Sequence, residues 1–539
     1  MAQILDINKY NGKPNILIGG DVCGIQNYIY QIVSRYAAKS LKGRSFYVQL
    51  LTDAIVRYML DNLKGAELVY NSGGSFFIIA PKERESDLDT RITEIENALW
   101  ERHRTSLYVA IAWVDLDTQN IENNLNERFA ELFEKRDQKK FAKFADKISD
   151  NYGTFFTPQS MGCNNDIDEI TGEYFDEDYA QGNNNDRVYY KPFDNEREVA
   201  IRKITDSQIL LGEKLRTAKF MTITEGSGGD FNFLDYQYTL DKNKGDIEFN
   251  VDNVEKPFFY AGGSWKFQTF DDLCDAKGDD DFKRLGVLRM DVDNLGEKFL
   301  EFSSFKEFQD LSNGLYKFFG KTIDAIKTEN YSDTVFIIYS GGDDVFAVGD
   351  WKDIMSFAEE VRTEFVEQFK GLTISAGMSL ITLKSPIMKG AEYAGDEEKR
   401  AKAHNNGQKN AISFFQTPLD WHNEFTPVKE LKNAIVKQCK ETGKRSFIQK
   451  ILQRWSNAEF EDHSINNKST YWLLSYDIKR LCERVSEENR SFYEKCIIEC
   501  CKGYGNKLNE QSITTYYHLL ELWALACRWA ELELRCETA

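Results

Sequence analysis

Residues 335–350 read VFIIYSGGDDVFAVGD, two apolar runs that flank a Gly-Gly-Asp-Asp turn. Apolar runs on either side of a short glycine-containing turn predict a β-hairpin. GVLRMDVDNLG at 286–296 predicts a strand that ends in carboxylates, and LTISAGMSLI at 372–381 predicts another strand. Apolar residues at helical spacing fill 302–328 and 351–369, between these strands. The resulting β-α-β-β-α-β order is typical of the ferredoxin-like unit.

A second unit with the same order lies nearer the N-terminus. NILIGG at 15–20 predicts a strand, ELVYNSGGSFFIIAP at 67–81 predicts a hairpin, and SLYVAIAWVDL at 106–116 predicts a last strand. Helices are expected at about 33–63 and 86–104. The interval from the first strand to the turn is about 50 residues in both units. The chain therefore contains an internal repeat, which indicates a duplicated domain.

The two units differ in their acidic residues. IGGDVCGIQ aligns with LRMDVDNLG and YNSGGSFFIIA aligns with YSGGDDVFAVG, which pairs Asp21 with Asp291, Ser75 with Asp343 and Phe76 with Asp344. Serine and phenylalanine side chains cannot hold a cation as a carboxylate pair does. We therefore expect one catalytic centre, in the second unit, and a nucleotide-binding face on the first.

The remaining segments complete an α+β fold with two ferredoxin-like palm domains. The stretch after the first unit is rich in charge, Asn and Gly, which predicts an irregular inserted α/β domain with a helical start. The end of the chain has apolar faces at helical spacing. The predicted domains are 1–116 for the first palm, 117–255 for the inserted domain, 256–415 for the second palm with its GGDD turn, and 416–539 for a C-terminal helical domain.

Three carboxylates of the second unit are the candidate catalytic and metal-binding residues. A strand end and a hairpin turn are neighbours in a ferredoxin-like sheet, so Asp291 would face Asp343 and Asp344 across adjacent strands. Such hard oxygen ligands suit Mg²⁺ or Mn²⁺, and two ions can assist an in-line displacement at phosphorus. Gly341 and Gly342 would permit a tight turn that lets a triphosphate approach the backbone closely.

Other polar residues of the second unit are expected beside the nucleotide. Asp293 and Asn294 lie just beyond the carboxylate strand and would touch phosphate or ribose. A helix expected at 386–404 and a strand at 411–415 bring Lys402 and Lys409 back toward the triphosphate, which is a common role for lysine.

Composition limits what the chain does alone. Its 539 residues carry a formal net charge of −19, whereas a protein that grips nucleic acid by itself is usually basic. The basic run at 135–147 is expected to be a solvated helix face. No apolar stretch suits a signal peptide or a membrane span, so a cytoplasmic protein without membrane contact is expected. The ten cysteines contain no CxxC pair.

With these motifs in place, the chain resembles the large subunit of type III CRISPR effector complexes, the CRISPR polymerase, in its Csm-type form. The carrying motifs are GDVCGIQNYIY (20–30), LKGRSFYVQLL (41–51), NSGGSFF (71–77), LGEKLRTAKF (211–220), GVLRMDVDNLG (286–296), SGGDDVFAVGD (340–350), ISAGMSL (374–380) and KNAISFF (409–415). GGDD alone would be weak evidence, but this ordered series is specific.

The resemblance implies a function. Two ATP molecules bind between the palms, and the GGDD palm joins ATP through 3′–5′ linkages into cyclic oligoadenylate second messengers when the crRNA-guided complex binds target RNA. The other subunits, crRNA and target RNA are then the partners. The resemblance also implies nucleotide-binding residues. They are Asp21, Gly24 and Ser75 of the first palm, with Val292, Ser340, Gly341 and Gly342 of the second.

The sequence departs from this family in two respects. Many relatives begin with a His-Asp nuclease domain, whereas this chain begins at the first palm and has no His-Asp dipeptide, so no deoxyribonuclease activity is expected. Relatives usually carry a four-cysteine zinc site between the palms. Here that region has only Cys163 and Cys274, so no zinc is expected.

Three alternatives to the oligoadenylate interpretation stay open. A cyclic dinucleotide synthase of the GGDEF type has a single palm and a phenylalanine after its acidic turn, whereas Val345 stands there in this chain. Some members of the resembled family transfer AMP to S-adenosylmethionine, and the pattern does not decide between these acceptors. A catalytically silent scaffold of the ribonucleoprotein would have no need for the three carboxylates.

Overall fold

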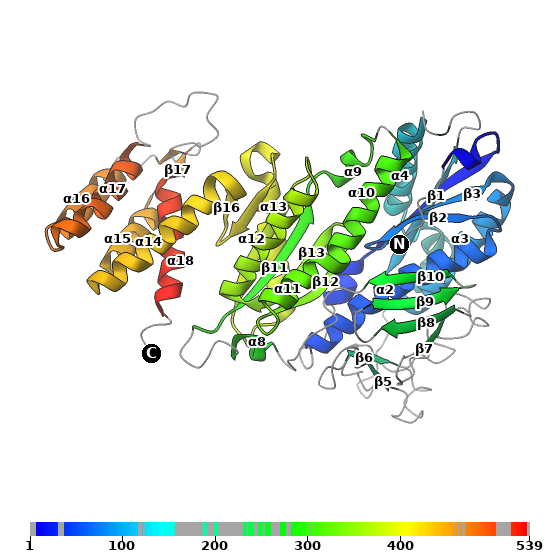
Figure 1. Cartoon of the computed structure of the whole chain (residues 1–539), viewed down its shortest axis with the longest axis horizontal. Coiled ribbons are helices and arrows are strands. Elements are labelled where there is room, and N and C mark those ends of the chain that lie inside the picture. The colour runs from blue at the N-terminus through cyan, green and yellow to red at the C-terminus, as the bar shows by residue number, and fades with distance from the viewer. Residues whose placement is uncertain are drawn as a thin grey trace.

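The computed structural model describes most of the chain. The described residues are 7–30, 37–116, 121, 124–156, 187–190, 199–202, 230–233, 236–241, 246–251, 254–259, 270–275, 282–302, 304–458, 460–461, 464–465, 469–502 and 519–535. Figure 1 shows the first palm sheet at one end of an elongated molecule, the second palm sheet in the middle, and the C-terminal helices at the other end.

The first palm sheet has four antiparallel strands. In the order β2-β3-β1-β4 they are Glu67–Ser72, Ser75–Pro81, Asn15–Cys23 and Tyr108–Leu116. The short helix η1 (Ile7–Tyr10) precedes the first strand. The helices that connect the strands are α1 (Ile25–Tyr30), α2 (Ala37–Asn62), η2 (Lys82–Arg84) and α3 (Glu85–His103). This is the predicted β-α-β-β-α-β order. Both middle strands are buried along most of their length, which suits their continuous apolar runs.

The second palm sheet repeats that arrangement and extends it. Its order is β12-β13-β11-β14-β15-β16, formed by Val335–Gly341, Asp344–Asp350, Leu285–Val292, Ile374–Ile381, Ala411–Phe414 and Thr417–Asp420. Strand β15 runs parallel to β14, and β16 pairs with β15. The sheet therefore continues past 415, the residue at which the sequence analysis ended the second palm.

Helices flank the second sheet, some in the segments predicted at 302–328, 351–369 and 386–404 and some short ones outside them. They are α8 (Asp271–Asp275), α9 (Leu295–Lys298), α10 (Phe305–Lys317), η5 (Phe318–Thr322), α11 (Ile323–Asn330), α12 (Trp351–Gln368) and α13 (Ile387–Gly407). The segment predicted as one helix at 302–328 contains a π-helical turn, η5, in which Phe318 and Phe319 are both fully buried. Asp350 caps α12 by accepting from the backbone N–H groups of residues 352 and 353.

The predicted inserted domain begins with two helices, as expected. They are α4 (Leu125–Phe141) and α5 (Ala145–Phe155), and α4 packs on strands β4 and β1 of the first palm. Among the described residues that follow are the short strands β5 (Arg187–Tyr190), β6 (Val199–Arg202), β7 (Asp230–Phe233), β8 (Tyr236–Asp241), β9 (Asp246–Val251) and β10 (Val254–Phe259). The motif at 211–220 and Cys163 lie outside the described residues, while Cys274 is buried.

The C-terminal part is mainly helical, as predicted. Its elements are η6 (Trp421–Phe425), α14 (Thr426–Thr442), α15 (Ser446–Ser456), β17 (Phe460–Glu461), β18 (Ser464–Ile465), α16 (Ser469–Cys482), α17 (Glu487–Lys502) and α18 (Leu519–Arg535). One hydrophobic core runs from the second palm into these helices, with Trp529 of α18 against Phe414 of β15. Within the described residues, no helix is both long enough and apolar enough to cross a membrane.

The two palms meet at equivalent hairpin turns. A Cβ atom built on Gly73 would lie 2.4 Å from the Cα of Gly342, and both glycines have positive φ angles, 62° and 70°. The Gly342 N–H also donates to the Ser72 Oγ at 3.1 Å. Contact between equivalent residues is what a pseudo-two-fold axis produces, so the palms lie face to face.

The strand register corrects the alignment of the two units by one residue. Asp21 is opposite Ser75 in the first sheet, as Asp291 is opposite Asp344 in the second. The N–H of Val22 donates to the Gly74 carbonyl, as the N–H of Val292 donates to that of Asp343. Ser75 is therefore the counterpart of Asp344, not of Asp343, because matching the Gly-Gly pairs ignores where each two-residue turn begins.

Candidate active site

The three predicted carboxylates gather where strands β11 and β13 of the second sheet meet the hairpin turn. Asp291 and Asp344 are directly opposite each other on β11 and β13. Asp343 occupies the turn, and its backbone carbonyl accepts from the Val292 N–H at 3.0 Å. The hairpin thus places Asp343 and Asp344 beside Asp291, near the C-terminal end of β11.

Burial gives these carboxylates unusual protonation behaviour. Burial first, and then the charge of Asp343, raise the pKa of Asp291 to about 7. Burial and the charge of Asp21 raise the pKa of Asp343, and burial with the charges of Asp343 and Asp291 raises that of Asp344 well above its usual range. Burial and mutual repulsion disfavour the charged forms of the three acids. A bound cation would therefore be needed to keep all three ionised.

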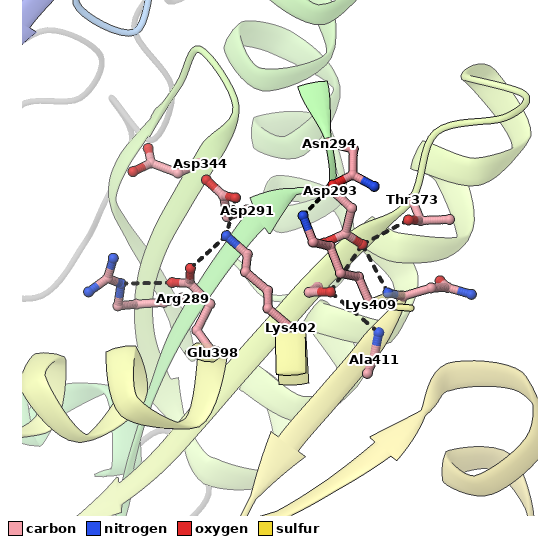
Figure 2. A network of polar contacts seen from close by, with 12 residues as sticks. Arg289, Asp291, Asp293, Asn294, Asp344, Thr373, Glu398, Lys402, Lys409 and Ala411 are labelled. Atoms are coloured by element: carbon pink, nitrogen blue, oxygen red, sulfur yellow. Dashed lines mark hydrogen bonds and ion pairs between the residues drawn. The ribbon is translucent and has the colours of Figure 1, made fainter. Parts of the chain in front are cut away.

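A chain of ion pairs connects Asp291 with the interior of the second palm. Lys402 of α13 contacts Asp291 and also lies 3.0 Å from Glu398, which in turn pairs with Arg289 at 3.2 Å. Figure 2 shows this chain, in which Lys402 lies between Asp291 and Glu398. The structure places Lys402 beside the carboxylates, and its expected contact with a triphosphate stays a prediction.

Gln26 connects the two palms and was missed by the sequence analysis as a site residue. Its Nε2 donates to Asp344 Oδ2 at 3.1 Å, and its Oε1 accepts from Arg289 at 2.9 Å. It lies on α1 of the first palm, 318 residues from Asp344 in the sequence. The available signal was the GDVCGIQ motif, in which Gln26 directly follows two residues that line the cleft.

Asp293 and Lys409 form a separate network from the three carboxylates. Asp293 is 3% exposed, and one of its oxygens accepts from Thr373 at 2.8 Å, Ser375 at 3.0 Å and the Asn410 N–H at 3.0 Å. Lys409, which has a φ of 62°, contacts the Asn294 side chain. Figure 2 shows the Asp293 carboxylate directed at this loop. Asp293 is therefore buried, and its carboxylate holds the loop that carries Lys409.

Two other residues expected at the nucleotide have structural partners. Ser340 is 3% exposed and donates to the Phe319 carbonyl of the π-helical turn at 2.7 Å. The Val292 side chain is in the hydrophobic core, so only its backbone serves the turn. Of the two glycines, Gly342 adopts the positive φ that the turn needs, whereas Gly341 ends strand β12.

A cleft of about 310 Å³ lies between the palms. Its lining residues come from both units and are Gly24, Ile25, Gln26, Asn27, Gly73, Tyr339, Asp343 and Asp344. Gly24 has a φ of 90°, and a Cβ there would lie 2.5 Å from the Ser106 carbonyl oxygen, so only glycine fits this wall. Asp21 and Ser75, which were also expected at the nucleotide, are not among the lining residues, and side chains of α4 contact them.

The residues of the second palm fit a divalent cation, although their present contacts do not form a ready-made cage. No group of three or more His, Cys, Asp or Glu side chains within the described ranges is arranged to hold a metal ion. Asp344 Oδ1 is nevertheless buried and accepts no hydrogen bond from a described residue. An orphaned carboxylate oxygen among raised-pKa acids is a suitable donor for Mg²⁺ or Mn²⁺.

The chain matches two family models that coincide with the palms. Residues 14–157 match domain B of the Csm1 subunit, and residues 284–413 match the second palm domain of Cas10/Cmr2. The first model spans the whole first palm sheet, and the second spans β11 to β14 of the second palm sheet and ends within β15. The second match spans the three carboxylates and both predicted lysines.

Curated relatives carry the description CRISPR system single-strand-specific deoxyribonuclease Cas10/Csm1 (subtype III-A). The protein from Methanocaldococcus jannaschii is 25% identical over 84% of this chain and 66% of its own length. That from Streptococcus thermophilus is 25% identical over 93% and 67%, and that from Mycobacterium tuberculosis is 27% identical over 86% and 62%. The chain thus spans about two thirds of the length of the curated relatives it matches.

Solved structures share the fold over nearly the whole chain. A Csm1–Csm4 cassette in complex with pppApA matches with a TM-score of 0.60 at 18% identity, over 97% of this chain and 70% of the other. Cassettes in complex with cA4 and with one ATP match with TM-scores of 0.58 and 0.57, at 18% and 20% identity, each over 96% and 70%.

Proposed function

We propose, from the premise that this chain is a homologue of the Cas10/Csm1 large subunits of subtype III-A, that its second palm is a divalent-metal-dependent nucleotidyltransferase. Its substrate is ATP, and its product is a 3′–5′ linked cyclic oligoadenylate. The observation that carries the proposal is the cleft between the palms, which joins the turn carboxylates Asp343 and Asp344 to the GIQN segment of the other unit.

The residues divide the chemistry among them. Asp291, Asp343 and Asp344 would hold Mg²⁺ or Mn²⁺, which supplies polarisation of the α-phosphate and neutralises charge that develops on the leaving pyrophosphate. The bond from a ribose 3′ oxygen to the α-phosphorus forms while the bond to the bridging oxygen breaks, and the hydroxyl proton passes to water. Lys402 and Lys409 offer cations to the triphosphate from the side of α13 and the loop after it.

The face-to-face palms explain how two nucleotides would meet. Equivalent turns at Gly73 and Gly342 touch, so a donor on the second palm and an acceptor on the first would face each other across one cleft. Holding both reactants in line supplies much of the rate enhancement in phosphoryl transfer. The Csm1–Csm4 cassettes with ATP, pppApA and cA4, which share this fold, support the assignment of adenylate chemistry.

We also propose that the chain acts within a type III CRISPR effector complex. The structural relatives pair Csm1 with Csm4, and one belongs to a type III-A interference complex. A net charge of −19 favours contact with crRNA and target RNA mainly through other subunits. Target RNA as the activating signal is what the resemblance to the family implies. The absence of deoxyribonuclease activity stays a prediction, since the relatives' names assign that activity to them.

Product analysis of the assembled complex tests the proposal. The chain is combined with its crRNA complex, Mg²⁺ and α-labelled ATP, with and without target RNA and with and without S-adenosylmethionine, and products are resolved by mass spectrometry. Rings that need target RNA and vanish in the Asp343→Ala, Asp344→Ala double variant are expected. An adduct that forms only with S-adenosylmethionine would change the acceptor. No nucleotide product with either metal would refute the enzyme assignment.

A further inference from the structure

The loop that joins α13 to β15 has an unusual backbone. His404 leaves the helical conformation with a ψ of 149°, and residues after it have positive φ angles, which are 49° at Asn405, 59° at Asn406, 62° at Lys409 and 49° at Asn410. Positive φ is uncommon for residues other than glycine, and such a backbone persists only where surrounding contacts hold it. The conformation of this α13–β15 loop therefore depends on what its two ends contact.

The far end of the loop is held by residues that follow β11 and by α12. The Asn410 N–H donates to the Asp293 carboxylate at 3.0 Å, and Lys409 contacts the Asn294 side chain. The Oδ1 of Asn410 also accepts from Arg362 of α12 at 3.4 Å. These contacts fix the part of the loop that leads into β15.

The near end of the loop is held by a buried histidine–glutamate pair. The Nε2 of His404 lies 2.6 Å from the Oε2 of Glu424, and the two side chains are only 10% and 5% exposed. An ionised carboxylate can only accept hydrogen bonds, so the Nε2 of His404 donates to it. The His404 carbonyl also accepts from the Gln408 N–H at 3.2 Å, which closes the loop on itself. The pair therefore fixes the point at which α13 stops.

Glu424 is a fixed partner because its own turn is held at several points. It lies in η6, and its Oε2 also accepts from the Asp420 N–H at 2.7 Å. The backbone N–H of Trp421, in the same turn, donates to the Asn410 carbonyl at 3.3 Å, and its indole N–H donates to the Ile374 carbonyl at 3.0 Å. Ile374 begins β14, the strand next to β11. The turn is thus anchored on the sheet that carries the carboxylates.

The pair lies between two lysines that are held in different ways. Lys402 is on α13 and forms ion pairs with Asp291 and Glu398. Lys409 is on the loop beside Asn294, so its position depends on the loop backbone (Figure 2). Neither member of the pair is among the residues that line the cleft between the palms. The pair can therefore act on a nucleotide through Lys409, and not by touching the nucleotide.

We propose that His404 and Glu424 are positioning residues, which hold the α13–β15 loop so that Lys409 meets the triphosphate from a fixed backbone position. The inference rests on the proposed function, in which Lys409 offers its cation to the triphosphate. A lysine side chain is long and flexible, so a fixed backbone reduces the freedom that it loses on binding phosphate. Without the pair, the left-handed residues would return to ordinary backbone angles and carry Lys409 away.

An ATP analogue with a methylene group between its α- and β-phosphates tests the proposal without turnover. Isothermal titration of the full chain with this analogue and Mg²⁺ should show about tenfold weaker binding in His404→Ala, the size expected when one charged contact is lost. His404→Gln should keep most of the affinity, because its amide N–H can still donate to Glu424. His422→Ala is the matched control, since His422 is an exposed histidine of the same turn and its loss should leave binding unchanged.

A double-mutant cycle separates positioning from general loss of stability. Lys409→Gln should weaken binding by itself, and His404→Ala should then add little, because the lysine through which the pair acts is already gone. Thermal unfolding checks that each variant folds. Glu424→Gln keeps the shape of the turn and should also weaken binding, so it serves where His404→Ala does not fold. In the assembled complex, His404→Ala should raise the KM for ATP with a smaller change in kcat.

Wild-type affinity in a folded His404→Ala variant, or an equal loss from His404→Ala with and without Lys409→Gln, would overturn the inference. Normal binding in Lys409→Gln would overturn it too. Product formation that needs Asp343 and Asp344 beside such a result would leave the catalytic proposal standing. Conversely, analogue binding that depends on His404 through Lys409, in a complex that makes no product, would support the positioning role and refute only the catalytic proposal.

Discussion

Replacing Gly73 by alanine should separate the two palms. The new Cβ would lie 2.4 Å from the Cα of Gly342, and ordinary contact begins at 3.4 Å, so the turns must part by about 1 Å. The neighbouring atoms are backbone, which cannot rotate aside as a side chain can. Alanine at the Gly73 φ of 62° also costs about 1–2 kcal/mol of stability. Because a displacement of about 1 Å between reacting groups can reduce a rate about 100-fold, nucleotide synthesis should fall by about that factor.

The matched control is Gly12→Ala in the same unit. Gly12 has a φ of 79°, but a Cβ there would meet no atom within 4 Å, so the variant carries the backbone cost without the clash. Product formation from ATP by the assembled complex and thermal unfolding of the chain are measured for both variants. Equal activity in Gly73→Ala and Gly12→Ala would refute the view that contact between the turns aligns the two nucleotides.

Further predictions concern the carboxylates and their partners. Mg²⁺ at 100 times its Kd should stabilise the wild-type chain by about 2.7 kcal/mol and so raise its Tm. The rise in Tm should be much smaller in the Asp343→Asn, Asp344→Asn double variant, and equal rises in a thermal scan would contradict the metal assignment. Asp293→Asn should lower stability to urea by about 1–3 kcal/mol and raise the KM for ATP, because the loop that carries Lys409 loses its charged anchor. Gln26→Glu should reduce product formation more than Gln26→Ala, because a fourth acid would then face Asp344; a milder effect of the glutamate would argue against this contact.

Several features of the fold followed from local sequence alone. Continuous apolar runs on either side of glycine turns predicted both hairpins, and the sequence predicted α3, α12 and α13 within a few residues. Such patterns are local, because a helix and a strand each have a fixed spacing between side chains that share a face. The same reasoning placed Asp291 beside Asp343 and Asp344, since neighbouring strands of a known unit determine which ends meet.

Other features arose only when the chain packed. The register that makes Ser75 the counterpart of Asp344 depends on where each turn begins, and two adjacent glycines permit more than one choice. Asp293 was expected to touch phosphate or ribose, but its carboxylate accepts from Thr373, Ser375 and the Asn410 N–H, which are distant in the sequence. Gln26 becomes a site residue through contacts that no periodicity encodes.

The sequence by itself determined the duplicated palm, its acidic hairpin and the absence of the acidic turn from the first copy, because apolar runs, turn chemistry and residue identity are properties of short segments. Tertiary structure alone decided that equivalent turns touch at Gly73 and Gly342, and that α4 turns its cations toward Asp21 and Ser75. The physical reason is distance along the chain: these contacts join segments whose meeting depends on the packing of whole units, and no local pattern records which surfaces will face each other.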